Sequence, residues 1–247
     1  MVDLVADIAP AYLSCLPKAG LSQSPRLRLK EYPMTNIPIL TANQISKSFK
    51  QKQVLNKLDF NVQENAIVAI CGANGSGKSV FMRVLAGLVK PDSGRVTIFD
   101  TTLGGKIEFP PYTGVHFDNS GLLLTETARN NLLLLAMVSN VVNKERIDEV
   151  IRLVGLDPLD KRLVRTYSTG MRQRLGIAQA LMEDPKLLML DEPTTGLDFA
   201  GQDWFHDLIQ KLQNQGKTIL ITSHSKEEIA KFCDQAYEMA GGQLRRL

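Results

Sequence analysis

A run of eight residues has the composition of a loop that binds phosphate. Glycines let backbone N–H groups curl around phosphate oxygens, because no bulky side chain is in the way. An apolar run at residues 66–71 precedes this loop and a helical pattern follows it, so a helix dipole would also attract the phosphate. The loop fits the pattern GxxxxGK[ST] with Gly72, Ala73, Asn74, Gly75, Ser76, Gly77, Lys78 and Ser79. We expect Lys78 to reach the β- and γ-phosphates of a nucleoside triphosphate, and the hydroxyl of Ser79 to ligate Mg²⁺.

Two adjacent carboxylates, Asp191 and Glu192, follow a second apolar run at residues 187–190. Successive side chains of a strand point to opposite faces, so two neighbouring acids do different work. We expect Asp191 to hold Mg²⁺ through water, and Glu192 to orient and deprotonate the water that attacks the phosphate. The sequence therefore predicts hydrolysis of a nucleoside triphosphate.

Three further motifs narrow the class of protein. Residues 167–171 read Tyr-Ser-Thr-Gly-Met and precede a helical pattern, residues 191–198 read DEPTTGLD, and residues 222–224 read Thr-Ser-His. Together with the phosphate-binding loop, they resemble the motifs of the ATP-binding cassette (ABC) ATPases, in particular the exporter-like ATP-binding subunits of ABC transporters. The resemblance runs from about Ile37 to the C-terminus, and the motifs follow the order and spacing of the family.

The resemblance implies roles for residues on both sides of the nucleotide. Residues 72–79 fall on the Walker A loop, Asp191 on the Walker B acid and Glu192 on the catalytic glutamate. His224 falls on the switch histidine at the γ-phosphate, which makes it a catalytic candidate with Glu192 and Lys78. Phe49 falls on the aromatic residue that stacks on adenine.

The signature motif of the family is implied at Ser168, Thr169 and Gly170. In the family this motif contacts the γ-phosphate that is bound by the opposite subunit, and Asp198 ends the neighbouring D-loop. The position also makes physical sense, because Ser168 and Gly170 open a helix whose free N–H groups attract an anion. The resemblance therefore implies a head-to-tail dimer with ATP between the two copies, formed with itself or with a homologous ATPase.

The Q-loop departs from the family pattern. Its usual glutamine falls on Asp118, counted from the strand at Gly114 and from Asn131. We expect Asp118 to contact the metal through its charge. The alternative is a register shifted by one residue, in which Asn119 is the equivalent.

Each motif also has a simpler explanation. The phosphate-binding loop could be a glycine turn, Asp191 and Glu192 could be an acidic strand end that meets solvent, and His224 could be a surface histidine near a helix cap. These alternatives lose weight because all the motifs occur together. His116 and His206 have no such setting, and we interpret them as structural.

The elements that must position these residues alternate between strands and helices. Residues 39–45 and 54–62 read as an antiparallel hairpin, residues 66–71, 187–190 and 218–222 as buried strands, and residues 120–182 as largely helical. A helix is expected from Lys78 to about Leu88. This alternation predicts an α/β fold: a P-loop NTPase core with a mostly parallel sheet, an antiparallel β subdomain and a helical subdomain at about residues 119–182.

The expected domain arrangement is a flexible N-terminal extension at residues 1–36 and an ABC ATPase domain at residues 37–247. Prolines interrupt every short apolar stretch of the extension. A start codon assigned too far upstream would explain this segment equally well, and a docking segment is a further alternative.

Composition excludes several classes of protein. The chain has 247 residues, 44% hydrophobic and 22% charged, which is ordinary for a globular protein and not for a disordered one. A net charge of +3 is too small to indicate nucleic acid as the main partner. The longest apolar run, residues 132–138, is far below the roughly 20 residues of a membrane span. Three widely spaced cysteines form no metal-binding pattern.

These observations and the resemblance together predict an ATP-binding and ATP-hydrolysing subunit of an ABC transporter. Without a membrane span, it would lie at the cytoplasmic face of the cell membrane and drive a separate integral membrane permease subunit. The signature motif and Asp118 favour export. ATP and Mg²⁺ are the expected ligands. The alternative is a soluble ABC-type ATPase that acts as an assembly scaffold without transport.

Overall fold

The fold is described by a computed structural model for residues 38–50, 52–104, 109–117, 121–139, 141–229 and 231–247. Within these ranges a central sheet has strands in the order β10-β9-β3-β8-β7-β6. Its strands are β3 (Ile67–Cys71), β6 (Thr113–Phe117), β7 (Leu187–Asp191), β8 (Thr218–Ser223), β9 (Gln235–Ala240) and β10 (Gln243–Arg246). All neighbouring pairs are parallel except β9 and β10, which are antiparallel.

The central strands β3, β7 and β8 are buried along their whole length. Side chains that alternate along β7 enter two different cores: Leu188 and Leu190 pack with the helical side of the molecule, while Leu187 and Met189 pack toward the other sheet. A strand covered on both faces needs continuous apolar sequence, which explains the uninterrupted runs in these segments.

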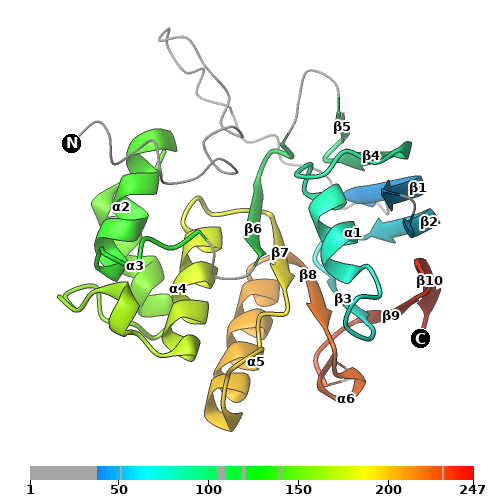
Figure 1. The fold of residues 1–247 in the computed structure, drawn as a ribbon. Helices are drawn as coiled ribbons and strands as arrows, with labels where there is room; N and C mark the ends of the chain where they lie inside the picture. The colour runs from blue at the N-terminus through cyan, green and yellow to red at the C-terminus, as the bar shows by residue number, and fades with distance from the viewer. Residues whose placement is uncertain (1–37, 51, 105–108, 118–120, 140, 230) are drawn as a thin grey trace, which may run out of the picture.

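A second, antiparallel sheet lies beside the first, in the order β2-β1-β4-β5 (Figure 1). Its strands are β1 (Leu40–Phe49), β2 (Lys52–Val62), β4 (Ser93–Ile98) and β5 (Thr101–Thr102). Helix α1 (Lys78–Leu85) lies between the two sheets, and its Phe81, Met82 and Leu85 are buried in the core that they share. The predicted hairpin is confirmed by the antiparallel pairing of β1 and β2.

The remaining helices pack mainly against the opposite side of the central sheet (Figure 1). They are α2 (Ala128–Ser139), α3 (Lys144–Leu153), α4 (Thr169–Leu181), α5 (Phe199–Asn214) and the short α6 (Lys226–Ile229), with a 3₁₀ turn η2 (Val164–Thr166) before α4. Arg129 of α2 and Asp148 of α3 form an ion pair with a 2.6 Å separation. In the part of the chain described here, none of the helices combines the length and the apolar character needed to cross a membrane. The predicted fold class is confirmed: an α/β core with a mostly parallel sheet, an antiparallel β part and a helical part.

Two local predictions differ from the structure. Helix α1 ends at Leu85 instead of about Leu88, because Gly87 takes a φ of 77°, which leaves the helical region. Strands β9 and β10 were not predicted, since their partly buried side chains show no clean alternation. The expected N-terminal extension, Asp118 and Asn119 lie outside the described residues.

Candidate active site

The residues predicted to handle phosphate follow strands that end at one edge of the central sheet. Strand register pairs Cys71 with Ser223 and Asp191 with Thr222. The phosphate-binding loop directly follows β3, Asp191 is the last residue of β7, and His224 follows β8. Parallel strands place their carboxyl ends at the same edge, which is where open α/β sheets bind ligands.

The loop between β3 and α1 has a backbone that requires glycine. Gly75 and Gly77 have φ angles of 77° and 111°, in a region that other residues rarely adopt. A Cβ on Gly72 would collide with the carbonyl oxygen of Met239 in β9. Gly77 also caps α1, and among the described residues no side chain bonds to this cap. The loop therefore leads directly into an open helix N-terminus.

Lys78 is the first residue of α1 and is only 4% exposed. Its Nζ donates to the carbonyl oxygens of Gly72, at 2.8 Å, and Ala73, at 3.3 Å. The same Nζ lies 3.3 Å from Oε1 of Glu192. Three oxygens thus match the three donors of the ammonium group, as a buried charge requires. Lys78 connects the loop after β3 to the acid after β7.

Glu192 is held from several directions. Its φ of 48° is unusual for a residue with a side chain, and such conformations persist only where the surroundings impose them. Its N–H donates to Oγ1 of Thr222 at 2.9 Å, and its carbonyl accepts from Nε2 of Gln173 at 3.4 Å. The Thr195 hydroxyl donates to Oε2 at 3.3 Å. The carboxylate is therefore fixed beside Lys78.

Thr222 is a site residue that sequence reasoning missed. Its fully buried hydroxyl donates to Oδ1 of Asp191 and accepts from the N–H of Glu192. One hydroxyl thus orients both acids. The only sequence signal was its position in a buried strand just before His224; the role depends on the register that places it opposite Asp191.

The donor set of the loop fits ATP and Mg²⁺. Oγ of Ser76 is buried and has no hydrogen-bond partner among the described residues, which suits a ligand rich in acceptors. The described residues contain no group of three His, Cys, Asp or Glu side chains that could hold a metal alone. Mg²⁺ usually takes one or two protein ligands and completes its shell with phosphate and water. Ser79 and Asp191 are the candidates for those protein ligands.

The predicted signature residues begin α4 and contact the D-loop of the same chain. The Ser168 side chain caps α4 by accepting from the N–H of Met171 at 3.2 Å. A Cβ on Gly196 would lie 2.8 Å from the Thr169 methyl group, and a Cβ on Gly170 would lie 3.3 Å from Leu197. The structure therefore groups the signature motif with residues 196–197, and it groups the P-loop with the two acids.

Tyr167, which directly precedes the signature residues, is held by burial and by a hydrogen bond. Its side chain is buried, and its hydroxyl donates to Oδ2 of Asp160 at 3.3 Å. Burial, reinforced by the charge of Asp160, raises the pKa of Tyr167 to about 12. The phenol is therefore neutral over the physiological range and acts as a packed hydrogen-bond donor.

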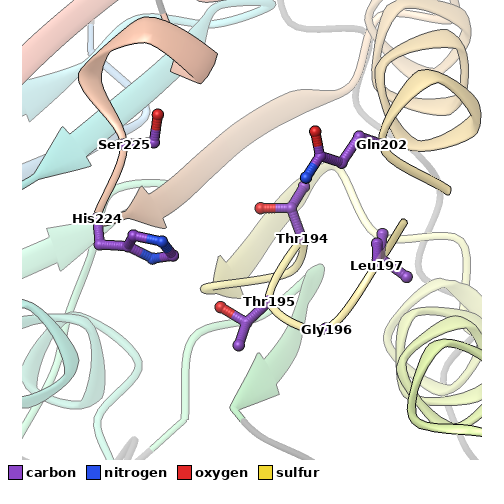
Figure 2. A pocket seen from close by; sticks show the side chains of 7 residues that line it. All are labelled: Thr194, Thr195, Gly196, Leu197, Gln202, His224 and Ser225. Atoms are coloured by element: carbon purple, nitrogen blue, oxygen red, sulfur yellow. The ribbon is translucent and has the colours of Figure 1, made fainter. Parts of the chain in front are cut away.

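His224 lies at the rim of a cavity of about 240 Å³. The cavity is lined by Thr194, Thr195, Gly196, Leu197, Gln202, His224 and Ser225. Figure 2 shows the exposed imidazole of His224 reaching across from the β8 side toward the threonines of the D-loop. The predicted switch histidine and the D-loop thus share one pocket.

Phe49 ends β1 and is 45% exposed, with Nζ of Lys47 lying 5.4 Å from its ring centroid. Its strand pairs with β2, whose Val54 carbonyl would be 3.2 Å from a Cβ on Gly77. An exposed aromatic ring at this end of the hairpin is available for stacking on a base. Asp118 lies outside the described residues, and Phe117, which precedes it, pairs with Asp191 in the sheet.

Comparison with known proteins agrees with this geometry. The sequence profile of the ABC transporter family matches residues 55–195, more than half of the chain. The YybJ protein of Bacillus subtilis (strain 168), an uncharacterized ABC transporter ATP-binding protein, is 38% identical over 81% of this chain and 92% of its own. The chain therefore belongs to the ABC transporter family, among its ATP-binding proteins.

Named relatives and solved structures extend the match. The bacitracin transport ATP-binding protein BcrA of Bacillus licheniformis is 38% identical over 83% of this chain and 68% of its own. The lantibiotic transport ATP-binding protein SrtF of Streptococcus pyogenes is 35% identical over 79% of this chain and 84% of its own. A dimeric ATP-binding cassette in a post-hydrolysis state, bound to ADP and Pi, matches with a TM-score of 0.76 at 25% identity, over 84% of this chain and 97% of that one. The cbiO1 protein of Clostridium perfringens, part of the cbiONQ transporter complex, matches with a TM-score of 0.74 at 26% identity. The match covers 84% of this chain and 87% of that one.

Proposed function

We propose that this protein hydrolyses ATP to drive a separate membrane permease that exports its substrate. The observation that carries the proposal is the connected group of Lys78, Glu192, Thr222 and Asp191 at the end of the phosphate-binding loop. It combines a cation for phosphate, a base for water and an acid for the metal in one hydrogen-bonded unit.

The chemistry follows from the contacts of Lys78. Phosphate oxygens compete with Glu192 for its ammonium group, since both are anions within reach of the same donors. When Lys78 turns to the β- and γ-phosphates, the carboxylate of Glu192 loses its cation and accepts a hydrogen bond from water instead. Glu192 then takes the proton of that water as the oxygen attacks the γ-phosphorus, while the bond from the γ-phosphorus to the β,γ-bridging oxygen breaks and ADP leaves. Ser79 and Asp191 would hold Mg²⁺, which would neutralise charge on the phosphates.

The second half of the site comes from another copy of the chain in this proposal. Ser168, Thr169 and Gly170 begin α4 next to the D-loop, and the helix N-terminus suits the γ-phosphate of a nucleotide on a facing subunit. His224 shares its pocket with that D-loop and would sense the γ-phosphate that lies beside Lys78 and Glu192 of its own chain. A head-to-tail dimer that closes on two ATP molecules joins these parts.

An apolar stripe on α2 supports a membrane partner. Leu134, Met137 and Val138 are exposed at a spacing of three and four residues. A helix normally turns such a stripe toward a core, so an outward-facing one indicates a partner. We propose that a cytoplasmic helix of the permease covers the stripe and holds the protein at the cytoplasmic face of the membrane. The relatives named for bacitracin and lantibiotic transport support export of a peptide-like substrate.

Membrane fractionation tests this function. In cells that express the protein with its permease, we expect it in the membrane fraction and expect ATP hydrolysis there. Met137→Asp should release it, because Met137 is 76% exposed in the stripe. Leu159→Asp is the matched control, since Leu159 is 75% exposed in a different segment. A protein that is active but stays in the soluble fraction, whatever the residue at 137, would instead support the scaffold ATPase.

A further inference from the structure

Phe199, the first residue of α5, has an unexpected environment. It is 87% exposed, more than any other large hydrophobic side chain among the described residues. Single exposed hydrophobic residues are common and need no explanation by themselves. Phe199 differs because it directly follows the D-loop and because its backbone is fixed: Oδ1 of Asp198 accepts from the N–H of Gly201 at 2.8 Å and caps the helix. A rigid first turn presents this ring to solvent.

A cavity beside the D-loop is lined in part by α5, the helix that Phe199 begins. Gln202, which lines the cavity, is three residues beyond Phe199 on α5, and residues three apart share one face of a helix. Phe199 and Gln202 therefore lie on the same face of α5, and Gln202 lines the cavity together with the D-loop and His224 (Figure 2). A cavity of about 150 Å³ accommodates a benzene ring in another protein, so a volume of about 240 Å³ admits a phenyl group. Its lining offers Leu197, threonine methyl groups and the face of His224.

A protruding ring and a matching cavity on one patch of surface are self-complementary. In an interface with two-fold symmetry, residue i of one copy contacts residue j of the other, and residue j contacts residue i in return. In such an interface, the ring of each copy can enter the cavity of the other copy. Aromatic residues that enter pockets near the centre of an interface commonly carry much of its binding energy.

We propose that Phe199 of each copy inserts into the cavity of a second copy of this chain and anchors the ATP-bound homodimer. The anchor rests on the nucleotide-bridged dimer of the proposed function and goes beyond it by assigning the contact that selects a partner. It places the ring against the D-loop and His224 of the facing copy, so closure of the dimer also covers one side of that pocket. A partner without an aromatic residue here would leave one cavity unfilled, which favours pairing of identical chains.

The test uses the full chain with Glu192→Gln, which slows hydrolysis and keeps ATP bound. Analytical ultracentrifugation with saturating Mg-ATP gives the dimer dissociation constant of this parent. Adding Phe199→Ala should raise that constant by at least about 30-fold, the size of one hot-spot residue. Adding Leu159→Ala, which removes a side chain that is 75% exposed in a different segment, should leave the constant within about twofold. Fluorescent ATP should bind the Phe199→Ala monomer as tightly as the parent monomer.

Filling the cavity tests the other half of the contact. Gln202→Trp should also raise the dimer dissociation constant. The double variant with Phe199→Ala should have a constant no higher than the higher of the two single variants, since both substitutions remove the same contact. Effects that multiply would show that the ring does not enter this cavity. A dimeric parent whose constant is unchanged by Phe199→Ala would overturn the anchor alone. A parent that stays monomeric with saturating ATP would overturn the nucleotide-bridged dimer itself, and the anchor with it.

Discussion

The P-loop and the signature segment each end at a helix N-terminus, yet the two termini differ in how their polar groups are satisfied. At α1 the cap is Gly77, and in the described part of the chain no side chain bonds to it. At α4 the cap is Ser168, whose hydroxyl already accepts from the N–H of Met171. Lys78 is buried among three oxygens, whereas Ser168 and Thr169 are exposed.

This difference shows how the work is divided within one chain. The α1 end and the two acids are connected by hydrogen bonds, so this half of the site is assembled on folding. The α4 end is complete as a helix and contacts only the neighbouring D-loop among the groups discussed above. It can therefore serve a nucleotide on another subunit without losing stability when it stands alone. Substitutions at the α1 end and the two acids should change nucleotide binding and hydrolysis at the site of the same chain. Substitutions at the α4 end should change ATP-dependent dimerisation.

The largest effect is expected for Lys78→Ala. The change removes the cation from the assembled half, and a charge-assisted contact contributes about 1.5–3 kcal/mol to binding and more in the transition state. ATP hydrolysis should fall to background, and ATP affinity should fall by roughly 10- to 100-fold in a fluorescence titration. Turnover near the wild-type rate would mean that this loop does not hold the nucleotide.

Glu192→Gln should have the next largest effect. Glutamine keeps the size of the side chain but cannot take a proton, so turnover should fall by about 100- to 10,000-fold. Size-exclusion chromatography with ATP should then show a dimer, while the wild-type protein with ADP should elute as a monomer. Hydrolysis at the wild-type rate would remove Glu192 from the role of base.

Ser168→Asp separates the two roles of the signature serine. Aspartate caps helices as well as serine does, so the melting temperature of the monomer should not fall. Its charge would oppose the γ-phosphate of the facing copy, and like charges across an interface cost several kcal/mol. ATP-dependent dimerisation should therefore weaken by about 100-fold or more, with unchanged ATP binding by the monomer. Loss of ATP binding by the monomer would mean that Ser168 acts within its own chain.

Thr222→Val tests whether one hydroxyl orients both acids. Valine keeps the shape but leaves Oδ1 of Asp191 and the N–H of Glu192 without this partner, which costs about 1–3 kcal/mol when such groups are buried. We expect the maximal rate to fall by roughly 10- to 100-fold and the Mg²⁺ requirement to rise. Thr222→Ser restores the hydroxyl and should recover most of the rate. If serine fails to do so, Thr222 acts through packing of its methyl group.

The smallest effect is a pH dependence at Tyr167 that changes stability alone. Its pKa of about 12 in the folded chain exceeds the ordinary value of 10, so the fold favours the neutral phenol. This contribution is complete below about pH 10 and is lost as pH rises through 12. Relative to Tyr167→Phe, the wild-type protein should lose up to about 2–3 kcal/mol of unfolding free energy over that window. Urea titrations between pH 8 and 11.5 would check this, and parallel curves would contradict it.

The phosphate-binding loop and the acids after β7 could be predicted because their chemistry requires particular residues at short spacing. Glycines at 72, 75 and 77 are needed for the backbone itself, and a buried strand shows as a continuous apolar run. The edge hairpin of β9 and β10 gave no such signal, because its partly buried residues can be polar or apolar.

By itself the sequence predicted a binding loop for a nucleoside triphosphate, the three buried strands of the central sheet and the family, since these depend on local residue types. The tertiary structure alone decided which distant residues meet. Thr222 orients Asp191 across 31 positions of sequence, and Lys78 meets Glu192 only through the strand order β3-β8-β7. Likewise, Phe199 becomes a candidate anchor only because folding leaves it exposed on the helix whose Gln202 lines a cavity, together with residues that follow β7 and β8. Such contacts depend on register and packing between segments, which no short stretch of sequence encodes.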